Sequence, residues 1–545
     1  MKKTATLIAA FCLAASFSIS ASDTGFMNGS TGLDISLAKH YTSGETNTDG
    51  GVMEIVSYCS GNGFAYAVNG KSGMLTAIDI TTEGEELSGI DINIKEMVHD
   101  DGFEYGDMTS VAVSPDSKLL ALALQDASYN KAGRIALFSI LENGMIEPCD
   151  IFTAGIQPDM VTFSPDGEYV LTADEGEPRE GYNAEDPEGS VTVVSLEDGI
   201  SAVIGFEAFD NPLSMKKLEE KGVIMQKGQL PSSDFEPEYI AVCGSNAYIT
   251  LQEANAVAIL DLDNMVIKGI ESIGFEDYSM VPVDIDKKDD AYNPKTYPTL
   301  RGIRMPDAIA AFTIDGTDYI VTANEGDARE WGDYINEDER DFGDGATSPT
   351  GAITAENSGL KGKVVFFNAD DYTSLDSDID YLYGGRTMTI FRVDGNNLTE
   401  VFTTADDAER ITNEYLPEYF NASNDNAVLD DRSGKKGPEA EAVTVGEIDG
   451  KMYAFLALER TGGIMVYDIT DPEESKFVNY INTRDFETVI SGTEEYEDGE
   501  LDKWVTGGDV APEGLAFISA NESPNGKPML LAAFEVSGTV ALYTF

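Results

Sequence analysis

The stretch YVLTADEGEPRE at residues 169–180 recurs almost unchanged as YIVTANEGDARE at residues 319–330. Each copy follows a similar lead-in, which is PDMVTFSPDGE from Pro158 and PDAIAAFTIDGTD from Pro306. Both copies and both lead-ins contain short runs of Val, Ile, Ala, Tyr and Phe bounded by Gly and Asp, a pattern that predicts strands joined by turns. Internal repetition of such units over tens of residues indicates a solenoid, a propeller or another repeat array.

The same order of strand, turn, strand, turn and strand can be traced seven times along the chain. Units that cannot bury their faces alone stack into blades, so the repeats predict an all-β, seven-bladed β-propeller with long loop insertions. The segment LDISLAKHY from Leu33 is expected to supply the outer strand of the last blade and so to close the ring. Two β-sandwich domains are the alternative, and a repeat that runs throughout the chain disfavours them. The copies begin at Met53, Asp107, Pro158, Pro237, Pro306, Pro438 and Pro512.

Some segments depart from the regular repeat. The fifth copy is expected to close with KVVFFNA at residues 363–369, after a long interruption. SMKKLEEKG at residues 214–222 is the best candidate for a short helix. Loops longer than about 12–15 residues are uncommon within compact domains, so the remaining insertions are expected to be surface loops. They fall near residues 263–304, 331–360, 394–436 and 472–510.

The first residues have the features of a secretory signal peptide, because two lysines precede an apolar run and a group of small residues. We therefore predict a signal peptide at residues 1–22 and a single propeller domain at residues 23–545, in an exported protein that is periplasmic or secreted. No later apolar run reaches the roughly 18 residues that a membrane span requires. Three cysteines lie outside the predicted signal peptide and are interpreted as buried structural thiols: Cys59, Cys149 and Cys243.

The net charge of −63, from 98 acidic and 35 basic residues, argues against nucleic acid as a partner, because binding to nucleic acid needs a basic surface. Self-repulsion on this scale destabilises a compact state unless counter-ions screen it. Adaptation to a salty medium and binding of hard cations both account for such a charge, and both remain open. The protein is expected to be a monomer.

Acidic residues recur at two positions of the repeats, the start of the first strand and the end of the second. These positions lie 15 to 22 residues apart, so a strand, a turn and a returning strand place both acids on one face of the propeller. Thirteen of the fourteen positions are acidic, whereas 98 acids among 545 residues predict two or three. Hydrogen bonding to strand-end N–H groups is the structural alternative. The predicted metal ligands are Asp159, Glu175, Glu238, Glu253, Asp307, Glu325, Glu439, Glu459 and Glu513.

Clustered carboxylates cannot all ionise without a counter-charge, so either cations bind or some of the carboxyl pKa values rise. Oxygen ligands, in a chain with only two histidines, favour Ca²⁺ over Mg²⁺ or Mn²⁺. Basic residues beside the acids are predicted to hold a phosphate or a carboxylate, although each of them could instead pair with a neighbouring acid. These predicted anion-binding residues are Arg179, Arg329, Lys436 and Arg460.

Four motifs of this chain resemble those of the choice-of-anchor I family: GIQPDM…TADEGEPRE, RMPDAIAAF…TANEGDARE, KGPEAEAVTVGEIDG and LERTGGIMVYDITDP. That family includes exported bacterial proteins and the mesenchyme-specific cell-surface glycoproteins of echinoderm skeleton-forming cells. The resemblance covers nearly the whole mature chain and implies a secreted β-propeller. In the third motif, Ala440 and Ala442 replace the usual Pro and Gly around Glu441, which is a departure from the family pattern.

The resemblance adds two associations, because echinoderm relatives are linked to calcium biomineralisation and some bacterial relatives carry an alkaline-phosphatase label. The leading hypothesis is an exported propeller that binds divalent cations, above all calcium, and presents loops to a small anionic ligand or to an extracellular protein or glycan. The alternative is a calcium-dependent phosphoesterase in which Glu175 and Glu325 hold metal while Arg179 and Arg329 hold phosphate. GxSxG, HExxH and P-loop motifs are absent, so such an enzyme would rely on metal-activated water. A scaffold without metal is the third interpretation.

Overall fold

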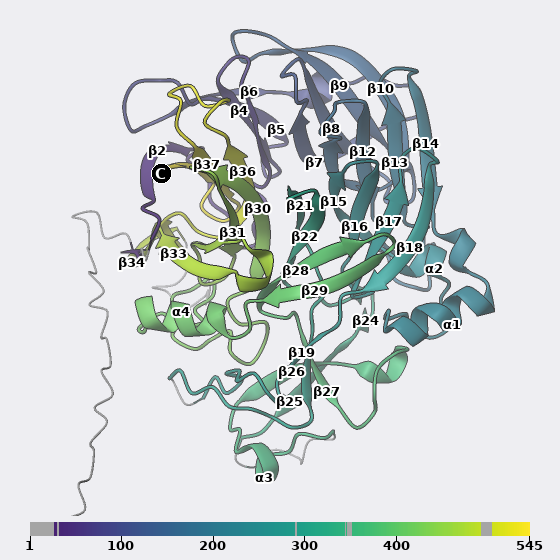
Figure 1. The fold of residues 1–545 in the computed structure, drawn as a ribbon, viewed down its shortest axis with the longest axis vertical. Helices are drawn as coiled ribbons and strands as arrows, with labels where there is room; N and C mark the ends of the chain where they lie inside the picture. Colours follow the sequence, from purple (N-terminus) through teal and green to yellow (C-terminus); the bar gives the residue numbers. More distant parts are fainter. Residues whose placement is uncertain (1–26, 30–31, 289–290, 344, 346–350, 492–503) are drawn as a thin grey trace, which may run out of the picture.

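The computed structural model describes residues 27–29, 32–288, 291–343, 345, 351–491 and 504–545. Antiparallel sheets of four strands stand around a centre, with their first strands innermost and their last strands at the rim (Figure 1). The first strands contact one another in the order β3, β7, β11, β15, β21, β30, β36 and back to β3. This closed circuit confirms the all-β propeller predicted from the repeats. The predicted signal peptide lies outside the described residues.

Each sheet is built from strands that follow one another outward. The first strands are Val56–Cys59 (β3), Tyr105–Val113 (β7), Pro158–Phe163 (β11), Pro237–Cys243 (β15), Ile309–Ile314 (β21), Ala440–Ile448 (β30) and Pro512–Ile518 (β36). The second strands are Phe64–Asn69 (β4), Leu119–Asp126 (β8), Tyr169–Asp174 (β12), Asn246–Leu251 (β16), Thr317–Asn324 (β22), Lys451–Leu458 (β31) and Met529–Phe534 (β37).

The outer half of each sheet continues the meander. The third strands are Met74–Asp79 (β5), Ala132–Ile140 (β9), Ser190–Ser195 (β13), Ala256–Asp261 (β17), Thr387–Asp394 (β28), Ile464–Asp468 (β32) and Thr539–Thr544 (β38). The outermost strands are Ser88–Ile92 (β6), Ile146–Ile156 (β10), Ile200–Gly205 (β14), Val266–Ser272 (β18), Asn397–Thr403 (β29), Lys476–Asn482 (β33) and Ser36–Thr42 (β2).

Strand β2 closes the ring as predicted, because it pairs antiparallel with β38, which contains the last residues of the chain. A short strand, Met27–Asn28 (β1), adds a fifth strand to the sheet of β33. The middle strands are buried because neighbouring blades cover both of their faces, and all six residues of β37 are buried. The core therefore lies between blades, as where Leu171 and Val193 pack in one cluster with Ile249 and Ala258 of the next blade.

The fifth blade differs from the prediction. Its second strand pairs with β28, whereas the expected closing strand at residues 363–369 contains Lys363–Phe367 (β26), which pairs with Glu337–Asp341 (β25) outside the blade. Both apolar runs suit a strand, so sequence alone does not decide which one returns to the blade. Two further small strand pairings are Glu330–Trp331 (β23) with Tyr334–Ile335 (β24), and Arg484–Ser491 (β34) with Val505–Gly508 (β35).

The predicted surface loops contain more structure than expected. Two segments of the first insertion, Phe275–Asp277 (β19) and Leu300–Ile303 (β20), form a sheet with Asp380–Tyr383 (β27). This sheet lies with β25 and β26 below the propeller in Figure 1. A buried cluster that includes Tyr278, Phe366 and Leu382 holds this layer together. The ranges 263–304, 394–436 and 472–510 also contain the outer strands β18, β29 and β33. The prediction had assigned these strands to the insertions.

The helices are few and short. Pro212–Lys221 (α1) matches the predicted helix; the others are Pro231–Asp234 (α2), Ala355–Ser358 (α3) and Asp407–Tyr415 (α4). Among the described residues, no helix is both long enough and apolar enough to cross a membrane. The expectation of buried thiols is correct for Cys59, but Cys243 is only partly buried and Cys149 is exposed because it lies on the outer strand β10.

Candidate functional site

The acidic residue that begins the first strand lies in a β-bulge in several blades. The strand register shifts between Pro158 and Met160, between Pro237 and Ile240, and between Pro512 and Gly514. A bulge re-aims the side chain of the extra residue. The residues placed in these bulges include Asp159, Glu238 and Glu513, which are three of the predicted ligands.

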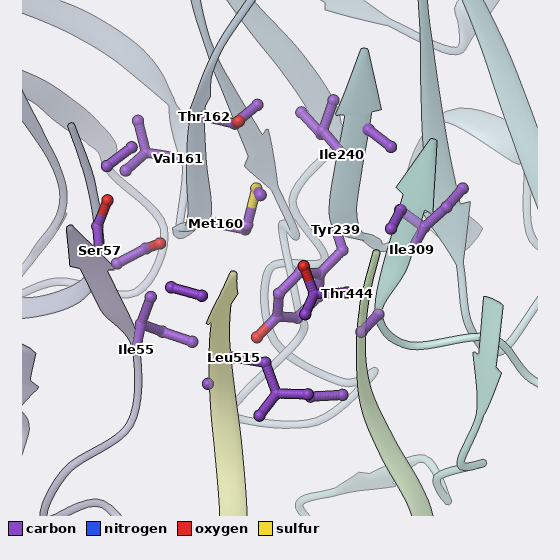
Figure 2. Close-up of a pocket in the computed structure, with 18 of the residues that line it drawn as sticks. Ile55, Ser57, Met160, Val161, Thr162, Tyr239, Ile240, Ile309, Thr444 and Leu515 are labelled. Atoms are coloured by element: carbon purple, nitrogen blue, oxygen red, sulfur yellow. The ribbon is translucent and has the colours of Figure 1, made fainter. Parts of the chain in front are cut away.

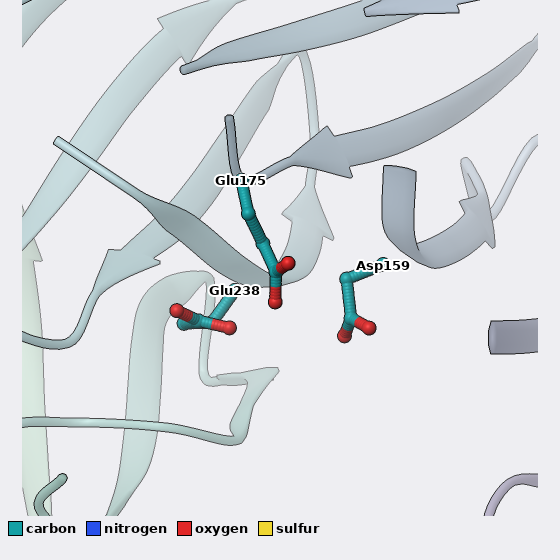
Figure 3. A group of neighbouring side chains, drawn as sticks. All are labelled: Asp159, Glu175 and Glu238. Atoms are coloured by element: carbon teal, nitrogen blue, oxygen red, sulfur yellow. The ribbon is translucent and has the colours of Figure 1, made fainter. Parts of the chain in front are cut away.

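The first carboxylate cluster consists of Asp159, Glu175 and Glu238. Each residue contributes one carboxylate oxygen to a group whose atoms all lie within 4.8 Å of one another, and the three side chains converge in Figure 3. Asp159 is the second residue of β11, Glu175 follows β12 and Glu238 belongs to β15 of the next blade. The cluster is therefore held by two neighbouring blades, as the spacing of the repeats predicts.

The first cluster has few counter-charges. In the described part of the chain, neither Asp159 nor Glu238 receives a side-chain hydrogen bond or an ion pair. Glu175 lies 3.4 Å from Arg179 Nη2. Burial, followed by repulsion from neighbouring carboxylates, raises the pKa of Asp159 to about 6 and raises those of Glu175 and Glu238 well above their usual range. Arg179 therefore pairs with one member of the cluster, and Asp159 and Glu238 have no ion-pair partner among the described residues.

The second carboxylate cluster consists of Glu325, Glu441 and Glu459, all buried, whose contributing oxygens also lie within 4.8 Å of one another. Its donors lie closer than Arg179 lies to the first cluster. Lys436 Nζ lies 2.6 Å from Glu325 Oε1, and Gln252 Nε2 donates to Glu325 Oε2 at 2.7 Å. Burial nevertheless raises the pKa of Glu325, Glu441 and Glu459.

Glu441 takes the place that the sequence prediction gave to Glu439. The register shift of the sixth blade falls between Ala440 and Val443, so Glu441 occupies the bulge. Glu439 is fully buried instead, and Arg432, Arg460 and Lys436 surround it. Although burial opposes ionisation, these cations hold the pKa of Glu439 well below its usual range. In several other blades a Pro directly precedes the acidic residue of the bulge. Ala440 takes that place here, so the sequence did not reveal that Glu441 is the equivalent acid.

Two other predicted ligands, Asp307 and Glu253, lie among the same acids. Burial raises the pKa of Asp307 well above its usual range, and repulsion from Glu325 and Asp159 adds to the effect, which places Asp307 near both clusters. Burial raises the pKa of Glu253 to about 7, and its buried Oε2 has no hydrogen-bond partner within the described chain. The acids are therefore electrostatically coupled across several blades.

A cavity of about 380 Å³ lies within the ring of first strands. Figure 2 shows Met160, Tyr239 and Leu515 among its lining residues, and Glu513 is the acidic residue that lines it. Burial and the charges of nearby acids, including Glu513 and Asp307, raise the pKa of Tyr239. The cavity is therefore lined mainly by uncharged residues, and Tyr239 lies close to the acids.

The two duplicated arginines have different environments. Arg179 has a side chain that is 41% exposed, and it pairs with Glu177 at 2.8 Å beside the first cluster. Arg329 is buried; it donates to Asp234 Oδ1 at 2.9 Å and lies over the ring of Tyr372. The structure therefore leaves Arg179 accessible to an anion and encloses Arg329 in ion pairs. Lys436 and Arg460, the other predicted anion ligands, contact Glu439.

Comparison with solved structures finds propellers and related folds at low similarity. The chain is 11% identical to a *Kuenenia stuttgartiensis* hydrazine synthase structure, with 92% and 97% of the two chains covered and a TM-score of 0.42. It is 12% identical to a *Pseudomonas aeruginosa* periplasmic gluconolactonase, with 90% and 98% covered and a TM-score of 0.40. It is 9% identical to the WD40 domain of *Toxoplasma gondii* coronin, with 95% and 87% covered and a TM-score of 0.42.

Comparison of sequences finds relatives at higher identity. The chain is 26% identical over 311 residues to the mesenchyme-specific cell surface glycoprotein of *Strongylocentrotus purpuratus*, a match that covers 49% of this chain and 40% of the relative. It is 27% identical over 168 residues to gigasin-3a of *Magallana gigas*, covering 30% of this chain and 56% of the relative. The chain thus spans about half the length of these curated relatives. The choice-of-anchor I domain model matches residues 54–472, and the chain belongs to this family.

Proposed function

We propose that this protein is an exported propeller that binds a divalent cation, calcium above all, at Asp159, Glu175 and Glu238. The observation that carries the proposal is the convergence of three carboxylates within 4.8 Å, two of them without a hydrogen-bond donor in the described chain. Ca²⁺ takes six to eight oxygen ligands in flexible geometry, and carboxylates bind it through one or both oxygens. Mg²⁺ and Mn²⁺ are the alternatives, and Mg²⁺ requires a stricter octahedral arrangement.

The fit of a cation rests on the donors that the chain provides. All three side chains are hard oxygen ligands, and repulsion among them is relieved when a cation neutralises the group. Glu253 adds a buried oxygen without a partner among the described residues, and its charge repels that of Glu238. A bound cation would supply charge neutralisation here, while the bulges at Asp159 and Glu238 hold the carboxylates in place.

The proposed role is to present the surrounding loops to a small anionic ligand or to an extracellular protein or glycan. The Strongylocentrotus purpuratus relative is named a cell surface glycoprotein, which supports an exported role for this chain. Arg179 is the accessible cation beside the first cluster and would contact an anion. Turnover of a phosphoester is the second candidate, because Arg179 and a cation at Glu175 would both face the phosphate, although Arg329 is enclosed elsewhere.

Calorimetric titration of Ca²⁺ into chelator-treated protein at high salt tests the proposal. We expect saturable binding, and we expect Glu238→Gln to weaken it by about 100-fold or more, since removal of residues that only support a ligand already costs 10–100-fold. Glu168→Gln is the matched control, because Glu168 is an exposed acid in the turn between β11 and β12. Heat that does not saturate in the unmodified protein contradicts the proposal. A phosphomonoester assay with and without Ca²⁺ separates turnover from binding alone.

A further inference from the structure

We propose that Lys436 is a tethered cation that occupies the second cluster, so that a divalent ion binds at Glu325, Glu441 and Glu459 only when the ammonium group is displaced. The inference extends the proposed cation binding to a second site on the same acidic face, and it rests on that function for the class of ligand. It follows from a difference between two clusters that each contain three carboxylates with contributing oxygens within 4.8 Å of one another.

The ammonium group of Lys436 lies close to three carboxylates, as a bound cation would. Its Nζ lies 2.6 Å from Glu325 Oε1, 3.4 Å from Asp327 Oδ1 and 3.5 Å from Glu439 Oε2. Its side chain is 14% exposed, and the neighbouring acids raise its pKa well above the usual range despite burial. The ammonium group is therefore charged and supplies one positive charge to an acidic pocket.

One ammonium group does not satisfy the whole cluster. Glu441 is 7% exposed, and its Oε2 is buried without a hydrogen-bond partner in the described chain. Glu459 accepts from Asn424 at 2.8 Å and lies 3.0 Å from Arg460. Burial without a partner is costly for a carboxylate, so Glu441 provides an unused ligand for a cation of higher charge.

The backbone around Lys436 is fixed, whereas its side chain can rotate. Arg386 is buried and donates to the carbonyl oxygens of Ser433 at 3.0 Å and Lys435 at 2.7 Å. The segment therefore stays in place when the side chain leaves the pocket. Because Arg432 and Arg460 continue to neutralise Glu439, departure of the ammonium group affects mainly Glu325 and Asp327.

Lys436→Met tests the inference by removing the ammonium group and keeping most of the side chain. In equilibrium dialysis at high salt against micromolar CaCl2, below the millimolar range expected to displace the ammonium group, we expect Lys436→Met to bind one more Ca²⁺ per chain than the unmodified protein. Lys435→Met is the matched control, because the adjacent lysine is exposed, and its stoichiometry is expected to stay unchanged. Addition of Glu441→Gln to Lys436→Met is expected to remove the extra ion.

An unchanged stoichiometry in folded Lys436→Met overturns the inference while leaving the first site intact. If Glu238→Gln loses Ca²⁺ binding and Lys436→Met binds no extra ion, the first site is supported and the inference about the second site fails. If the unmodified protein binds no Ca²⁺ but Lys436→Met binds one, the proposed function fails and the inference stands.

A second measurement uses the unmodified chain and does not depend on the folding of a variant. Acetic anhydride is expected to modify Lys436 at least severalfold faster in millimolar Ca²⁺ than in chelator, as read by mass spectrometry, with Lys435 unchanged. An equal rate for Lys436 in both conditions overturns displacement of its ammonium group.

Discussion

Arg329→Met is expected to lower the free energy of unfolding by about 3–5 kcal/mol, because removal of one partner leaves a buried charge uncompensated. The guanidinium is 1% exposed, lies 2.9 Å from Asp234 Oδ1 and lies 3.5 Å from Glu236 Oε2. Both acids are themselves buried. Methionine fills most of the volume and donates no hydrogen bond, so the loss reports chiefly on charge. Equilibrium unfolding in urea measures it.

The duplicated sequence supplies the control for this experiment. Arg179 occupies the matching position, but its side chain is 41% exposed, and exposed ion pairs contribute roughly 0–1 kcal/mol. Arg179→Met is therefore expected to change the free energy of unfolding by about 1 kcal/mol or less. Equal losses in the two variants would contradict the distinction between an enclosed and an accessible arginine.

Lowering the pH from 8 to 5 is expected to stabilise the metal-free protein by several kcal/mol. Burial and neighbouring acids raise the pKa of Glu54 to about 8, and burial raises those of Glu253 to about 7 and Asp159 to about 6. The folded state therefore holds protons that the unfolded chain has already released. Stability is present below the ordinary carboxyl pKa and is lost as the pH rises through these raised values, at about 1.4 kcal/mol for each unit of pKa shift.

Thermal unfolding in chelator, followed between pH 5 and pH 8, measures this dependence. Glu54→Gln is expected to flatten the upper part of the curve, whereas Glu168→Gln is expected to leave its shape unchanged. Saturating Ca²⁺ is expected to flatten the curve as well, because the cation replaces protons at Asp159. A protein that becomes less stable from pH 8 to pH 5 would contradict the raised pKa values.

The sequence was sufficient to predict the propeller and part of the site. The recurrence of YVLTADEGEPRE and the spacing of acids within each repeat predicted that Asp159 and Glu175 converge, because a hairpin returns its chain to the same edge. Glu238 joined them because adjacent repeats become adjacent blades. The sequence also predicted that the segment from Leu33 closes the ring, because the last repeat lacked an outer strand.

The sequence could not predict contacts that depend on the inserted segments. Arg329 pairs with Asp234, 95 residues away, and the similarity between Arg329 and Arg179 gave no sign of that partner. The choice of Glu441 over Glu439 depends on a bulge, and Ala440 in place of Pro removed its signal. The third strand of the fifth blade depends on which of two apolar runs returns after the insertion.

Because β2 pairs with β38, the ring of blades can close only late in folding. Ser36 and Thr544 are 508 positions apart and their hydroxyl oxygens lie 3.3 Å apart, so this blade contains contacts of very high sequence separation. Such contacts form slowly because nearly the whole chain must be brought together. During synthesis, β2 stays unpaired until β38 emerges, and an unpaired strand is open to premature β-pairing over that interval.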